Sequence, residues 1–144
     1  MEVLLPNIQT SIYLAGFAQI ALVLGSLAIP RILNWNMELA KVRTLIKQMF
    51  WTYAAYILVI KLSFGLLSLL AYKELTNGSL LAKAICGFIS IYWSSRVLIQ
   101  FFYFDRKDFP SGMWNKLGEV TLIALLLLFS TVYGIAFYFN CIHF

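Results

Sequence analysis

The fold is decided by one stretch, Ser79–Asp108, which reads SLLAKAICGFISIYWSSRVLIQFFYFDRKD. Its apolar run is long enough to cross a bilayer, for which an α-helix needs about 20 residues. At about 100° per residue, Gly87 and Ser90 fall on one face of this helix, whereas Arg96 and Gln100 fall on the opposite face. The stretch therefore predicts a membrane helix with one face suited to close helix contact and an opposite face that carries charged and polar side chains.

The composition extends this interpretation to the whole chain. Of its 144 residues, 62% are hydrophobic and 12% are charged, whereas soluble domains carry about 25% charged residues. The net charge of +5 does not indicate nucleic-acid binding, because the basic residues flank apolar runs and do not gather on one soluble face. We therefore expect an all-α integral membrane protein in contact with lipids, without a nucleic-acid partner.

Four apolar runs predict a single domain over residues 1–144, built as a four-transmembrane-helix bundle. The expected spans are about 8–30, 49–72, 79–104 and 117–140. Charged and apolar residues alternate over 37–48, which predicts an amphipathic approach to the second span along the membrane surface. Small residues also recur along the first span at the spacing that lets a partner helix come close: Ala18, Ala21, Gly25 and Ala28.

The basic residues predict an orientation. Seven lie in the first and third connections, namely Arg31, Lys41, Arg43, Lys47, Arg106, Lys107 and Lys116, and two flank the second connection, Lys73 and Lys83. The excess of Lys and Arg in cytoplasmic loops then places the first and third connections in the cytoplasm. We expect a bacterial inner-membrane protein with both termini on the outer, periplasmic or extracytoplasmic, side.

Lys61 lies at the centre of the second expected span. A charge at the centre of a membrane helix costs about 2.5 to 3.5 kcal/mol on insertion scales, so another group must compensate it. On a helical wheel Lys61 shares its face with Ser68 and Tyr72, and Gln19 of the first span lies at a similar height. These four residues are therefore a candidate ligand or ion site. The alternative is a structural lysine that is tied to Gln19 and hydroxyl groups or that snorkels past Tyr72.

Arg96 and Glu119 lie at matching heights in the third and fourth spans, each about two turns from the cytoplasmic end. A guanidinium and a carboxylate that face each other in a dry bundle can form a charge-assisted pair. We therefore predict an intramembrane ion pair between them, extended by Gln100. Its role is either a structural clamp between the two helices or part of a headgroup site.

Catalytic chemistry has little support in the sequence. His143 is the single histidine, so neither a bis-histidine haem nor a three-ligand zinc site can be assembled within one chain. The two cysteines, Cys86 and Cys141, form no CxxC motif, and there is no glycine-rich phosphate loop. We expect no catalytic residues and no metal site, and the sequence indicates no cofactor.

Three functions of different class remain. The first is a non-catalytic subunit or scaffold of a larger membrane assembly or of a homo-oligomer. The second is an oligomeric transporter or channel for a small anion or for protons, which would use Lys61 and Gln19. The third is a lipid-handling protein in which Arg96 and neighbouring basic residues hold a headgroup. We rank the scaffold first, because the sequence offers no catalytic constellation.

Overall fold

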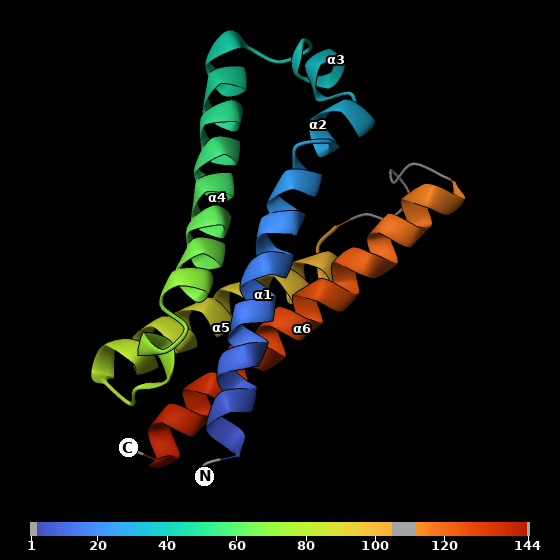
Figure 1. Ribbon diagram of the computed structural model, residues 1–144. Helices are drawn as coiled ribbons and strands as arrows, with labels where there is room; N and C mark the ends of the chain where they lie inside the picture. The colour runs from blue at the N-terminus through green and yellow to red at the C-terminus, as the bar shows by residue number, and fades with distance from the viewer. Residues whose placement is uncertain (1–2, 105–111, 144) are drawn as a thin grey trace.

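A computed structural model (Figure 1) describes residues 3–104 and 112–143 of the chain. Arg106 and Lys107, which contribute to the expected orientation, lie outside the described residues. The part of the chain that the structure describes contains helices and no strand. Four helices are long: α1 Leu4–Ser26, α4 Thr44–Leu70, α5 Leu80–Phe102 and α6 Met113–His143. Three are short: α2 Ile29–Ile32, α3 Trp35–Leu39 and the 3₁₀ helix η1 Glu74–Thr76.

Four described helical segments are long and apolar enough to cross a membrane: Leu4–Ile32, Thr44–Leu70, Leu80–Phe102 and Met113–Ile142. The expectation of an all-helical chain with four candidate spans is therefore confirmed. The stretch 37–48, however, is not one amphipathic helix. It is divided between α3 and the first turn of α4, because Arg43 adopts an extended conformation with φ −59° and ψ 146° just before α4 begins.

Local sequence explains the turns between the helices. Asn34 separates α2 from α3 with φ 51° and ψ 45°, a left-handed conformation that asparagine tolerates better than most residues. Gly78 has φ 76° at the end of the connection between η1 and α5. The hydroxyl of Ser79 then accepts a hydrogen bond from the Ala82 amide at 3.1 Å and caps α5.

The long helices form two antiparallel pairs, α1 with α4 and α5 with α6, and the pairs meet where α1 contacts α6. At one end of the molecule the start of α1, η1, the start of α5 and the end of α6 come together (Figure 1), and we call this the closed end. At the other end, the start of α4, the end of α1 and the start of α6 are spread apart, and we call this the open end.

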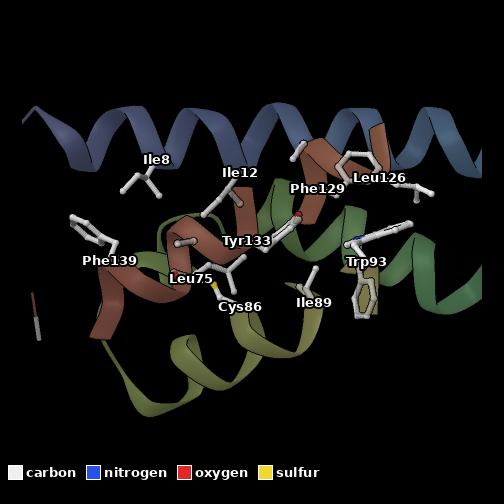
Figure 2. Close-up of a cluster of buried hydrophobic side chains, with 13 residues drawn as sticks. Ile8, Ile12, Leu75, Cys86, Ile89, Trp93, Leu126, Phe129, Tyr133 and Phe139 are labelled. Atoms are coloured by element: carbon white, nitrogen blue, oxygen red, sulfur yellow. Dashed lines mark hydrogen bonds between the residues drawn. The ribbon is translucent and has the colours of Figure 1, made fainter. Parts of the chain in front are cut away.

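The buried core is concentrated toward the closed end. Figure 2 shows apolar side chains from α1, η1, α5 and α6 filling the space between these helices, among them Ile12, Leu75, Cys86, Ile89 and Tyr133. Toward the open end, no residue of α4 before Phe64 is buried, and no described residue of α6 before Leu126 is buried. The fold thus has one packed half and one half whose helices are largely uncovered.

The close approach of α1 to α4 occurs at two glycines. A Cβ atom on Gly16 would lie 3.0 Å from the carbonyl oxygen of Gly65, and one on Gly65 would lie 2.9 Å from Ile20 Cγ1. The small-residue stripe expected on α1 does not make this contact: Ala21, Gly25 and Ala28 are exposed, and their approach to a partner helix stays a prediction. The helix turns its other face inward because that face carries both Gly16 and the polar Gln19.

The small-residue face of α5 does make the expected close contact, and its partner is α6. A Cβ on Gly87 would lie 3.1 Å from the Phe137 ring. Ser90 donates a hydrogen bond to the Ser130 carbonyl oxygen at 3.2 Å, and the hydroxyl groups of Ser94 and Ser130 are 2.5 Å apart.

Candidate functional site

A buried chain of hydrogen bonds links three helices in the middle of the molecule. The amide Nε2 of Gln19 in α1 donates to the hydroxyl oxygen of Tyr133 in α6 at 2.5 Å. The Tyr133 hydroxyl in turn hydrogen-bonds Ser68 of α4, and Ser68 Oγ donates to the Phe64 carbonyl oxygen at 2.8 Å. All three side chains are fully buried. We name Gln19, Tyr133 and Ser68 the hydroxyl cluster.

Lys61 does not belong to the hydroxyl cluster. It is half-buried, seven residues before Ser68 on α4, which corresponds to about 10 Å of helix. Gln19 and Ser68 hydrogen-bond Tyr133, and no hydrogen bond among the described residues joins either of them to Lys61. The four-residue site expected from the helical wheel is therefore not assembled, because the phenol of Tyr133 occupies the position opposite Gln19 and Ser68.

Tyr72, the fourth member of that expected group, lies at the closed end. Its ring makes an edge-to-face contact with Tyr13 at 5.5 Å between centroids. Together they border a shallow surface hollow that is also lined by Pro6, Gln9 and Thr10. Three helical turns separate Tyr72 from Lys61, so the two side chains take part in different environments.

Lys61 lies one helical turn from the contact between α4 and α5. The two helices touch where the centroids of the Phe64 and Tyr92 rings are 5.2 Å apart. Lys61 precedes Phe64 by one turn and Arg96 follows Tyr92 by one turn, so both residues are placed on the open side of this aromatic contact. We name Lys61 and Arg96 the cation pair.

The predicted ion pair between Arg96 and Glu119 is not formed. Among the described residues the one salt bridge joins Lys41 to Glu38 at 3.2 Å. The Arg96 guanidinium carbon lies 5.9 Å from the centre of the Phe104 ring. Glu119 is half-buried on α6.

Gln100 extends the cation pair along α5. It follows Arg96 by one helical turn and is 3% exposed, and its amide Nε2 has no hydrogen-bond partner. The Nε atom of Arg96 is also buried without a partner. Unpaired buried donors cost about 1 to 3 kcal/mol each. Two buried donors of α5, Arg96 Nε and Gln100 Nε2, thus have no hydrogen-bond partner among the described residues.

Sequence reasoning missed two polar residues. Tyr133 is the centre of the hydroxyl cluster, although the sequence analysis did not select it. Asn140 was not selected, yet it is fully buried and holds the connection before α5: its Nδ2 donates to the Leu75 carbonyl oxygen at 2.8 Å and its Oδ1 accepts from the Gly78 amide at 3.0 Å. An asparagine in the last apolar turn of a membrane helix was the available signal.

No group of three His, Cys, Asp or Glu residues that could hold a metal ion is found among residues 3–104 and 112–143. The cation pair and Gln100 offer hydrogen-bond donors and positive charge, which suit oxygen atoms of an anionic group. No protein-family model, no curated protein and no solved structure matches the chain.

Proposed function

We propose that the chain is a non-catalytic subunit or scaffold, and that a neighbouring transmembrane helix, from another membrane protein or from a second copy, packs along the first half of α4. The observation that supports this proposal is the lack of any buried residue in α4 before Phe64. More than half of this membrane-crossing helix therefore has no fully buried residue.

Polar groups on this half of α4 make a protein neighbour more favourable than lipid tails. Tyr53 and Tyr56 are 59% and 64% exposed, and Lys61 follows them on the same helix. Hydrocarbon offers no acceptor to a tyrosine hydroxyl, whereas helix interfaces in membranes commonly satisfy such groups by interhelical hydrogen bonds. In the proposed orientation, the basic connections at the open end face the cytoplasm of a bacterial inner membrane and both termini face outward.

Site-directed photocrosslinking in native membranes tests the proposal. A benzophenone maleimide attached to a Tyr56→Cys variant, in a Cys141→Ser background, is expected to give one product of defined mass. The same reagent at Leu128→Cys is the control, because Leu128 is similarly exposed on α6. Native mass spectrometry in mild detergent is expected to show the matching complex. A lone monomer with equal labelling at both positions would refute the proposal.

A further inference from the structure

The short helix α3 and the start of α4 line a hollow at the open end of the molecule. Its volume is about 600 Å³, and its lining residues are Leu33, Trp35, Glu38, Leu39 and Phe50. Pockets that bind small molecules have volumes of about 300 to 1,000 Å³ and combine apolar walls with a few polar groups. This hollow has that size and that composition, with four apolar or aromatic side chains and one carboxylate.

Aromatic contacts join the two helices at the wall of the hollow. The ring centroids of Trp35 on α3 and Phe50 on α4 are 4.9 Å apart. Trp51 contacts both rings, at 5.9 Å from Trp35 and 6.1 Å from Phe50. An aromatic ring attracts a cation that lies over its face within about 6 Å, and tryptophan does so most strongly. Trp35, Phe50 and the Glu38 carboxylate border one space, and each of these groups attracts an ammonium ion.

The charges around the hollow favour a zwitterion over a free cation. The sequence has no acidic residue other than Glu38 between positions 3 and 73, whereas Arg31 and Arg43 are exposed in the same connection. Their positive charge would repel a free organic cation. Lys41 Nζ lies 3.2 Å from Glu38 Oε2 in an exposed pair, and such pairs are weak enough to exchange partners. An ammonium group at Glu38 and a phosphate toward Lys41 would match both charges.

The position of the hollow fits the headgroup region of a bilayer. Residues 33–43 separate the candidate spans Leu4–Ile32 and Thr44–Leu70, so α3 lies where one span ends and the next begins (Figure 1). Tryptophan is enriched at this level of a membrane. Leu45 and Met49 are exposed on the first two turns of α4 and offer apolar surface to acyl chains.

We propose that this hollow binds the headgroup of a zwitterionic phospholipid. The ammonium group lies against the Glu38 carboxylate and the Trp35 ring, and the phosphate lies toward Lys41. The inference goes beyond the scaffold function and does not depend on it, because a headgroup can occupy the hollow whether or not a helix packs along α4.

Lipid binding by the purified full-length chain tests the site. The protein is delipidated in mild detergent and titrated with phosphatidylethanolamine, phosphatidylcholine or phosphatidylglycerol of the same acyl chains, and bound lipid is counted by native mass spectrometry. Because exposed basic residues attract any anionic lipid, the readout is the ratio of the affinity for each zwitterionic lipid to the affinity for phosphatidylglycerol.

Two variants of the hollow are expected to lower this ratio. Trp35→Leu keeps the wall apolar and removes the ring, and we expect a fall of about threefold, as for an exposed cation–π contact. Glu38→Gln removes the carboxylate and is expected to lower the ratio about threefold or more. Glu38 is exposed, so Glu38→Gln is expected to fold and keeps the test decisive if Trp35→Leu is unstable.

Matched controls use the same substitutions away from the hollow. Trp114→Leu changes a tryptophan that is 85% exposed at the start of α6, and Glu74→Gln changes an exposed acid in η1. Neither residue lines the hollow. We expect both to leave the ratio unchanged within about 1.5-fold, because distant surface charges are screened by salt. All variants are checked for helicity and a monodisperse elution profile.

Three outcomes would overturn the proposal. The first is an unchanged ratio in both Trp35→Leu and Glu38→Gln. The second is an equal fall in Trp114→Leu, which would be a general effect of interfacial tryptophans. The third is displacement of the lipid by an equal concentration of soluble glycerophosphocholine, which would make the hollow a site for a free zwitterion. Absence of crosslinking at Tyr56→Cys together with the expected ratios would refute only the scaffold function.

Discussion

The closed and open ends of the bundle treat polar groups in opposite ways. At the closed end, the buried amide of Asn140 is fully engaged with Leu75 and Gly78, in the middle of apolar side chains. At the open end, Arg96 and Gln100 keep buried donors that have no partner. Asn140 thus holds backbone in place at the first end, whereas two buried donors at the second have no hydrogen-bond partner.

We therefore expect the closed end to determine mainly the stability of the protein and the open end to determine mainly what it binds. Native cores leave few buried polar groups unpaired, and the exceptions need a reason. The closed half contains most of the buried side chains, so we expect it to determine the free energy of unfolding, although Gln19 Oε1 and Trp93 Nε1 are also buried in the core without a hydrogen-bond partner. The open half is expected to tolerate substitution and to determine what the protein binds. Four substitutions test this contrast, in order of decreasing effect on stability.

The largest effect is expected at the crossing of α1 and α4. In Gly16→Val, new atoms would meet the Gly65 carbonyl, the Ser68 Cβ and the Leu69 Cγ, each 3.0 Å from the Cβ position. We expect a loss of about 3 kcal/mol, at the upper range for overpacking. Gly25→Val is the matched control, because nothing lies within 4 Å of its Cβ position. Unfolding in detergent, followed by tryptophan fluorescence, measures both; equal losses would contradict the assigned crossing.

The next effect is expected at the closed end. Asn140→Leu removes the acceptor of the Gly78 amide and the donor to the Leu75 carbonyl, so we expect a loss of about 2 kcal/mol. Hydrogen exchange should also increase at the Gly78 amide. Asn115→Leu, at an exposed position of the same helix, is the control and is expected to change stability by less than about 0.5 kcal/mol.

A smaller effect is expected in the hydroxyl cluster. Tyr133→Phe leaves the Gln19 amide and the Ser68 hydroxyl without the phenol, although Ser68 keeps its bond to the Phe64 carbonyl. Interhelical hydrogen bonds in membranes average about 0.6 kcal/mol, so we expect a loss of about 1 kcal/mol. Tyr138→Phe, 67% exposed on the same helix, should be neutral in the same unfolding measurement. A neutral Tyr133→Phe would mean that the cluster adds nothing to stability.

The smallest effect is expected at the open end. Lys61→Met removes a membrane-depth cation that forms no ion pair with a described residue, so the stability of the lipid-free protein should change by less than about 0.5 kcal/mol or increase. The same unfolding assay and the level of accumulation in the membrane provide the measurement. A loss as large as that of Asn140→Leu would show that Lys61 is part of the structural core.

The sequence predicted the helices well because membrane spans depend on length and hydropathy, which are local properties. It predicted partnerships poorly because they depend on the rotation of each helix about its axis. Equal height along the bundle suggested that Gln19 contacts Lys61 and that Arg96 forms an ion pair with Glu119. Neither interaction is formed in the structure. On α5 the Gly87 and Ser90 face was identified correctly, since small residues there are sharply separated from polar ones. On α1, small residues occur on more than one face, and composition alone could not choose Gly16 over Gly25.

The crossing at Gly16 and Gly65 divides α4 into a long segment toward the open end and a short segment toward the closed end. Thr44 stands 21 residues from Gly65, about 30 Å along the helix, whereas Lys61 is four residues from it, about 6 Å. If α4 tilted by about 5° about this crossing, Thr44 would move by about 3 Å and Lys61 by about 0.5 Å. The open end can therefore widen or narrow by a few ångströms at Thr44 while Lys61 stays nearly in place.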